Sequence, residues 1–222
     1  KLSPVMAWLA FAACALPLAL GFLVPAWVLG SYALTFYQDT LDAKFWTFTL
    51  NSLSLSAAAA LVAIVLGVFL AYSLRLGRAP WLNAVARLAA LGYAVPGAVL
   101  AIGILMFLGF VDNAVDGAMQ SVLGISTGLI FSGTVAAVTF GYVARFLSLS
   151  FGAAESGLAK VTANMDGAAR TLGVGPLETL RRVHLPMLKG SIMTAALLVF
   201  VDCMKELPMT TILRPFDFET LA

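Results

Sequence analysis

The chain has 222 residues, of which 61% are apolar and only 11% are charged. An ordinary soluble domain is about 45–50% apolar and about 25% charged, so this chain has too little polar material to cover a water-soluble globule. The mean hydropathy of +0.98 excludes intrinsic disorder, and the net charge of +2 gives no basic field that would indicate nucleic acid as a partner. We therefore expect the lipid bilayer to be the solvent of this protein.

Five apolar stretches reach the roughly 20 residues that a helix needs to cross the hydrocarbon core of a membrane. Gly, Ala and Ser recur in each of them, as is typical where helices approach closely in lipid. The sequence therefore predicts an all-α, polytopic transmembrane helical bundle that forms a single domain over residues 1–222. The predicted spans are Met6 to Leu29, Leu50 to Leu74, Ala84 to Phe110, Leu129 to Leu149 and Leu188 to Leu213.

Basic residues gather in the second and fourth connections between these stretches, for example Arg75 and Arg181. Short loops rich in Lys and Arg stay in the cytoplasm, so the chain is expected to begin inside the cell and to end outside it. Lys1 at the start and the polar end at Ala222 indicate a piece of a longer polypeptide. With an odd number of spans, we expect that at least one returning helix, a sixth span, is missing from this sequence.

The fourth connection, a cytoplasmic loop of about 150–187, has helical patterning of its own. Thr162 or Asn164 can cap a short helix that carries Asp166 in its first turn, where a negative charge suits the helix dipole. Gly173 can end this helix, and Pro176 suits the first turn of a second one. The sequence therefore predicts a helix, a tight turn and a helix on the cytoplasmic side.

This hairpin presents a small apolar patch of Ala168, Ala169 and Leu172 on a helix that is expected to face solvent. Small residues permit close backbone approach, so the patch suits a helix that lies in a groove of another protein. Alternatively, the hairpin rests on the inner leaflet and Arg181 and Arg182 hold it near anionic lipid. The pattern alone leaves both interpretations open.

The hairpin also carries a motif, which reads Ala168-Ala169, three residues, Gly173, nine residues and Val183-His184-Leu185-Pro186. It resembles the EAA signature of permease subunits of binding-protein-dependent ABC importers, which have the MetI-like fold. In that signature Glu-Ala-Ala, three residues, Gly, nine residues, Ile, one residue and Leu-Pro form the loop that docks into the ATPase subunit. Here Gly167 stands in place of the Glu, with Asp166 next to it, and Val183 replaces the Ile.

The resemblance implies a role in ATPase coupling for the residues of this motif. It also implies that ATP and Mg²⁺ bind to the partner subunit, and that this chain holds no cofactor or metal of its own. The implied coupling residues are Asp166, Gly167, Ala168, Ala169, Leu172, Gly173, Val183, Leu185 and Pro186.

The segments Val201 to Pro208 and Leu213 to Ala222 resemble the distal part of iron(III)-type permeases, and the chain looks like the second lobe of such a protein. This resemblance implies ferric iron as the substrate and the bacterial inner membrane as the location. It also implies a periplasmic substrate-binding protein, two cytoplasmic ATP-binding subunits and a second permease lobe as partners. Relatives that carry thiamine, polyamines or sulfate share the docking loop, so these substrates remain alternatives.

The fifth predicted span contains three charged residues, Asp202, Lys205 and Glu206, at helical spacing i, i+3 and i+4. Ionisable groups at membrane depth are costly unless they are paired or face water, so they are candidates for the translocation path. Lys205 can pair with Asp202, which leaves Glu206 on the same face, and Pro208 weakens the helix just beyond. Asn51 is a weaker candidate for the path. The alternatives are charges at the outer interface and contacts that only stabilise helix packing.

Several motifs that would indicate an enzyme do not occur in the sequence: a Gly-x-x-x-x-Gly-Lys-Ser/Thr loop, His-Glu-x-x-His or a cluster of cysteines. The prediction is therefore a permease subunit that is not itself an enzyme and takes its energy from a separate ATPase. A secondary transporter or channel, driven by an ion gradient through the charges of the fifth span, is the alternative. A membrane-embedded enzyme ranks far behind.

Overall fold

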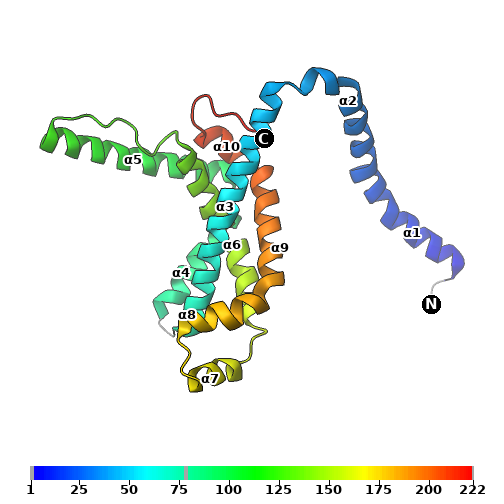
Figure 1. The fold of residues 1–222 in the computed structure, drawn as a ribbon. Coiled ribbons are helices and arrows are strands. Elements are labelled where there is room, and N and C mark those ends of the chain that lie inside the picture. Colours follow the sequence, from blue (N-terminus) through cyan, green and yellow to red (C-terminus); the bar gives the residue numbers. More distant parts are fainter. Residues whose placement is uncertain (1–2, 78–79, 222) are drawn as a thin grey trace. The chain divides into compact units, whose positions relative to one another are not determined.

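The computed structural model describes residues 3–77 and 80–221 (Figure 1). Its residues divide into two compact units, Lys1–Thr47 and Phe48–Ala222. Within the described residues all regular elements are helices, and five of the helical stretches are long and apolar enough to cross a membrane. The predicted all-helical fold with five spans is thereby confirmed. The five stretches are Pro4–Gln38, Ala43–Leu76, Gly97–Leu123, Val135–Leu158 and Pro176–Met204.

The first unit contains α1 (Pro4–Leu18), a π-helix (Ala19–Leu23) and α2 (Val24–Thr40). Pro4 opens α1, and the hydroxyl of Ser3 accepts a hydrogen bond from the backbone N–H of Met6 at 3.4 Å. Pro17 and Pro25 flank the π-helix. Because proline lacks an N–H donor, the helical hydrogen-bond ladder changes register between these two positions without ending.

In the second unit, α3 (Ala43–Leu76) and α6 (Val135–Leu158) contain most of the buried residues, and α6 contacts α4, α5, α9 (Leu185–Met204) and α10. The close contacts fall on glycines. A Cβ on Gly67 would lie 2.8 Å from the backbone N of Phe151, and one on Gly157 would lie 2.3 Å from Cδ2 of Leu188. Small residues therefore let these helices approach as expected in lipid.

The predicted third span begins too early. Residues 80–91 form a separate helix, α4 (Pro80–Leu91), which is followed by a 3₁₀ turn (Gly92–Ala94) and then by α5 (Gly97–Leu123). Pro96 disfavours helical geometry in the residue before it, and Val95 is accordingly extended, with φ −84° and ψ 132°. The span therefore starts at Gly97 and not at Ala84.

The predicted fourth span also begins too early, because residues 124–134 form a loop that folds back on α5. Asp112 of α5 is fully buried and accepts hydrogen bonds from the backbone N–H groups of Ile130, Phe131 and Ser132 at 3.0, 2.8 and 2.8 Å. One turn further along α5, Asp116 accepts from the backbone of Thr127 at 2.6 Å. Two carboxylates thus organise this apolar loop, and the span starts at Val135.

The fifth span ends at Met204 and not at Leu213. Lys205 and Glu206 leave helical geometry, with Glu206 at φ −84° and ψ 85°, and a short helix, α10 (Leu207–Leu213), follows. Pro208 lies in the first turn of α10, where its missing N–H costs nothing. The apolar run is therefore interrupted and does not continue as one helix.

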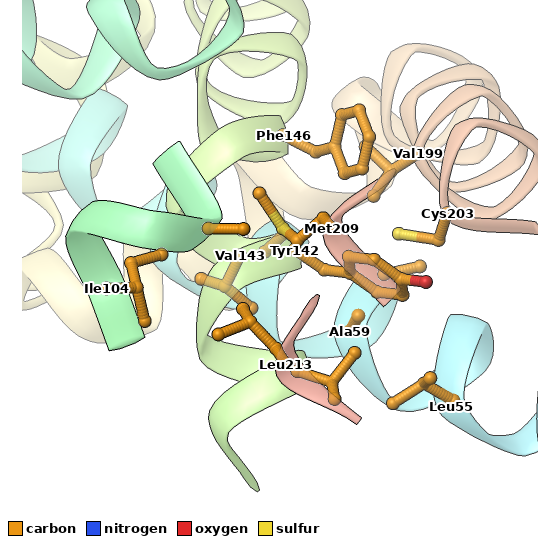
Figure 2. Close-up of a cluster of buried hydrophobic side chains, with 14 residues drawn as sticks. Leu55, Ala59, Ile104, Tyr142, Val143, Phe146, Val199, Cys203, Met209 and Leu213 are labelled. Carbon is orange, nitrogen blue, oxygen red and sulfur yellow. The ribbon is translucent and has the colours of Figure 1, made fainter. Parts of the chain in front are cut away.

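The core of the second unit lies where α10 packs against α5 and α6. Figure 2 shows Tyr142 and Phe146 of α6 within a cluster of buried side chains, with Met209 and Leu213 of α10 beside them. Gly141 provides the room, since a Cβ there would lie 2.8 Å from the sulfur of Met209. The short helix α10, which follows the second interruption, therefore belongs to the packed interior of this unit.

Candidate functional site

The predicted hairpin of two helices and a turn is present. It consists of α7 (Ala163–Thr171), α8 (Pro176–Thr179) and a π-helix (Leu180–His184) that continues into α9. Gly173 makes the turn with φ +73°, a left-handed conformation that favours glycine. The backbone N–H of Val174 donates to the carbonyl of Ala169 at 2.9 Å, which closes α7. The helix, turn and helix that the glycine and proline positions predict are therefore confirmed.

Asp166 lies on the side of α7 that faces the second unit's bundle. Its Oδ2 lies 2.8 Å from Nη2 and 3.0 Å from Nε of Arg75, in the last turn of α3. Its Oδ1 lies 2.8 Å from Nε2 of His184, whose side chain is 1% exposed. The same guanidinium donates to the carbonyls of Leu158 at 2.7 Å and Val161 at 2.8 Å. One arginine thus joins α3, the end of α6 and α7.

Burial raises the pKa of Asp166, but hydrogen bonds from Arg75 and His184 outweigh this effect and hold the pKa below its ordinary value of 3.8. The carboxylate is therefore ionised in the hairpin at neutral pH. The second half of the hairpin is attached at the same place. The hydroxyl of Tyr72 donates to the carbonyl of Pro176 at 2.7 Å, and its ring packs edge-on against His184 at 5.3 Å.

The opposite side of the hairpin is open. Gly167 and Ala168 are exposed, and the side chains of Leu172 and Leu177 are 80% and 78% exposed. The sequence pattern places Ala169 in the same patch, but its side chain points inward and is buried. Consecutive residues of a helix point about 100° apart, so Ala168 and Ala169 face different sides. The apolar patch therefore consists of the two leucines with the small residues beside them.

The remaining motif residues form the base of the hairpin. Val183 and Leu185 are half-buried where the π-helix meets α9, and Pro186 is exposed in the first turn of α9. Glu178 and Arg182, at helical spacing i, i+4, pair at 2.8 Å on the exposed side. The structure thus gathers the motif in one hairpin, divided between an exposed face and a base fixed to the bundle.

The charged residues of the fifth span lie at the interruption between α9 and α10. Nζ of Lys205 lies 2.7 Å from Oδ1 of Asp202, as expected. The expectation that Glu206 shares their helical face is wrong, because the helix ends at Met204 and Glu206 turns away. Its carboxylate lies 3.6 Å from Nε of Arg145 on α6, and the side chains of Arg145 and Glu206 are only 17% and 12% exposed.

Sequence reasoning missed Arg145. The signal was available, because a single arginine stands within an otherwise apolar predicted span, and such residues are functional candidates by default. Its Nη1 donates to the carbonyl of Val95 at 3.0 Å, at the interruption before α5. Arg145 therefore contacts both helix interruptions of the unit.

Asn51, a weaker candidate for the translocation path, binds the backbone of the C-terminal segment. Its side-chain N–H donates to the carbonyl of Glu219 at 2.9 Å, and the neighbouring hydroxyl of Ser52 accepts from the backbone of Leu221 at 2.8 Å. These bonds hold segment 214–221 against α3. In the part of the chain that the structure describes, no group of three or more His, Cys, Asp or Glu residues could hold a metal ion.

Residues 63–214 match the family described as the binding-protein-dependent transport system inner membrane component. Among curated proteins, the chain is 28% identical over 193 residues to PhnV of Salmonella typhimurium, whose name places it in a 2-aminoethylphosphonate transport system as a permease protein. It is 27% identical over 198 residues to WtpB of Thermococcus kodakarensis, named as a molybdate/tungstate transport system permease protein.

These alignments cover 86% and 85% of this chain, and the chain spans 66% of the length of PhnV and 72% of that of WtpB. The matched family region contains Arg75, Arg145, the hairpin and both helix interruptions. The chain therefore belongs to the MetI-like permeases, the inner membrane components of binding-protein-dependent ABC transport systems.

Proposed function

We propose that this chain is the transmembrane permease subunit of an ATP-driven importer, and that hairpin 162–186 receives the movement of cytoplasmic ATP-binding subunits. The observation that carries the proposal is the two-sided construction of the hairpin. Leu172 and Leu177 are exposed on one side, while Asp166 is bonded to Arg75 and His184 on the other. An apolar helix surface of this kind suits a groove on a partner protein.

The attachment of the hairpin supports its use as a lever. A displacement of α7 reaches α3 through Arg75, because this guanidinium binds Asp166 together with the carbonyls of Leu158 and Val161. It reaches α9 through the π-helix, which is continuous with that span. Closure of the ATP-binding subunits would therefore move both spans together and exchange inward-open and outward-open arrangements.

The position of Asp166 bears on the departure from the EAA signature. Since Asp166 is engaged by Arg75 and His184, we infer that it anchors the hairpin and does not replace the missing glutamate in a contact with the ATPase. Gly167, at the glutamate position, is exposed, and a Cβ there would meet nothing within 4 Å. The ATPase contact of this chain then rests on the apolar face of the hairpin.

For the remaining partners we propose a periplasmic substrate-binding protein, a second permease lobe and the lipid of a bacterial inner membrane, with ATP and Mg²⁺ bound by the ATPase. This chain would have no catalytic residue and no cofactor. Two substrate classes have support. The names of PhnV and WtpB favour a small oxyanion. The segment from Val201 to Pro208, which resembles iron(III)-type permeases, favours ferric iron.

Identification of the ligand carried by the purified binding protein would separate these two classes. Phosphonate, molybdate or tungstate in that protein would support the oxyanion, and iron would support the second class. An ion-gradient transporter gains no support from the geometry, because Lys205 pairs with Asp202 and Glu206 pairs with Arg145.

The test of ATPase coupling uses two glycines of the turn. Gly173 has φ +73°, which strains a β-branched side chain, whereas Gly175 has φ −71°, which any residue adopts. A Cβ meets nothing within 4 Å at either position, so the comparison isolates backbone conformation. We expect Gly173→Val to lose ATPase co-purification and uptake with the bundle still folded, and Gly175→Val to retain both. Uptake that survives Gly173→Val but collapses with the proton gradient would instead establish the ion-driven alternative.

A further inference from the structure

Two helix interruptions of the second unit lie against the same helix, α6. One runs from Gly92 to Pro96, between α4 and α5, and the other comprises Lys205 and Glu206, between α9 and α10. Non-helical backbone at membrane depth occurs where it is buried in protein or lines a cavity, and broken helices form the substrate and ion sites of many transporters. The feature that joins these two interruptions is therefore of interest.

Two residues of α6, one turn apart, donate hydrogen bonds to backbone carbonyl groups of the interruptions. Nη1 of Arg145 donates to the carbonyl of Val95 at 3.0 Å. The hydroxyl of Tyr142 donates to the carbonyl of Glu206 at 3.4 Å. The guanidinium of Arg145 also faces the carboxylate of Glu206, with Nε and Oε2 3.6 Å apart. Arg145 is thus bonded to one interruption and paired with the other.

The contact is close and largely shielded from solvent. A Cβ on Gly97, the first residue of α5, would lie 2.2 Å from Oε1 of Glu206 and 2.6 Å from Nη1 of Arg145. Nε of Arg145 is buried and makes no hydrogen bond within the described residues, because 3.6 Å is too long for one. Arg145 lies ten residues into α6, or about 15 Å of helix, which is half of a hydrocarbon core of roughly 30 Å.

We propose that Arg145 and Glu206 form a latch between the two interrupted segments, and that this latch sets the balance between the inward-open and outward-open arrangements of the permease. The proposal rests on the proposed importer function and adds two positioning residues, Arg145 on α6 and Glu206 in the second interruption. Neither residue contacts the hairpin, because Arg145 lies near the middle of α6, whereas Arg75 binds the end of α6 at Leu158.

The latch acts because its energy depends on where the interruptions lie. A charge pair away from water is sensitive to small changes of distance, and a helix interruption is where a span bends. If α5 moves away from α6, Arg145 loses its bond to the carbonyl of Val95. If α10 moves away, Arg145 loses its pairing with Glu206, and both charges are left with weaker partners. The interaction energy of the pair therefore favours the arrangement that keeps it. Movement of the hairpin has to overcome this energy in order to reach the other arrangement.

Cys203 is a native reporter for this movement. It is buried one residue before the end of α9, close to the interruption, and the sequence contains only one other cysteine, Cys14. In a Cys14→Ser background, the full permease is co-expressed with its ATP-binding subunits and placed in lipid nanodiscs. The alkylation rate of Cys203 by N-ethylmaleimide is measured by mass spectrometry with and without ATP, and phosphate release gives the ATPase rate.

The latch predicts that Arg145→Gln and Glu206→Gln each raise the alkylation rate without ATP by about tenfold and bring the ratio of the rates with and without ATP close to one. The double variant should be no faster than either single variant, since residues that act as one unit are not additive. Arg145→Lys, which keeps the charge, should recover part of the ATP dependence. Glu219→Gln serves as the matched control, because Glu219 pairs with Arg214 just after α10 and does not join the interruptions.

A folded Glu206→Gln complex with the wild-type ATP dependence would overturn the latch, as would two single effects that multiply to about a hundredfold in the double variant. If Arg145→Gln fails to assemble, Glu206→Gln and Arg145→Lys decide the question. Failure of the importer function itself would show earlier and differently, because the wild-type chain would then not assemble with ATP-binding subunits or support ATP hydrolysis.

Discussion

Replacement of Arg75 by alanine should detach the hairpin from the bundle. The guanidinium makes two contacts with Asp166, at 2.8 and 3.0 Å, and two with the carbonyls of Leu158 and Val161, at 2.7 and 2.8 Å. Its side chain is 18% exposed and that of Asp166 24%, so solvent replaces these bonds only in part. Breaking a largely buried ion pair and leaving its acceptors unpaired costs about 3 kcal/mol.

A loss of about 3 kcal/mol raises the population of detached hairpin by roughly a hundredfold. Amide hydrogen exchange in nanodiscs measures this directly, because the amides of α7 exchange through local opening. We expect their protection factors to fall by about that amount in Arg75→Ala, while amides of α6 near Arg145 keep theirs. Arg182→Ala is the control, since its pair with Glu178 is exposed and worth only about 0.5 kcal/mol. Unchanged protection of α7 in Arg75→Ala would refute the anchoring role.

Three further predictions concern single side chains. Because the folded pKa of Asp166 lies below its ordinary 3.8, the stability that this carboxylate adds to the hairpin is present above about pH 4 and is lost as the pH falls through the lowered value. The hydrogen-exchange protection of α7 should fall over the same pH range, and Asp166→Asn should remove this pH dependence. Asp112→Ala should leave three backbone donors of the 124–134 loop without their acceptor, so that amides 130–132 exchange faster than in Asp112→Asn, which keeps an acceptor oxygen. Gly97→Ala should force the Arg145 pair apart and lower the free energy of unfolding by about 1–3 kcal/mol, which thermal unfolding measures, whereas Gly103→Ala, with nothing within 4 Å of its Cβ, should not.

Features encoded within a few neighbouring residues could be predicted from the sequence. The hairpin is one, because Gly173 and Pro176 end and begin helices for local steric reasons whatever surrounds them. The five spans are another, since a long apolar stretch has few alternatives to a membrane helix. The pair of Asp202 with Lys205 followed from helical spacing alone.

Features that depend on contacts between distant segments could not be predicted. Arg75 and Asp166 are 91 residues apart, and no local pattern indicates that Asp166 faces the bundle. Prolines within apolar runs posed a second difficulty, because Pro96 and Pro208 accompany full interruptions whereas Pro17 does not end the helical run. Whether a proline kinks or ends a span depends on groups such as Arg145 that bind the freed carbonyls, and those groups come from another helix.

Site-specific photo-crosslinking tests the central claim, that the exposed face of the hairpin binds an ATP-binding subunit, most directly. A benzophenone side chain is placed at Leu172, which points outward, or at Ala169, which points into the bundle. In membranes that contain the whole transporter, we expect an adduct with the ATP-binding subunit from position 172 and none from position 169. No adduct from position 172, together with labelling of Leu172→Cys by a membrane-impermeant maleimide from the periplasmic side, would contradict the account.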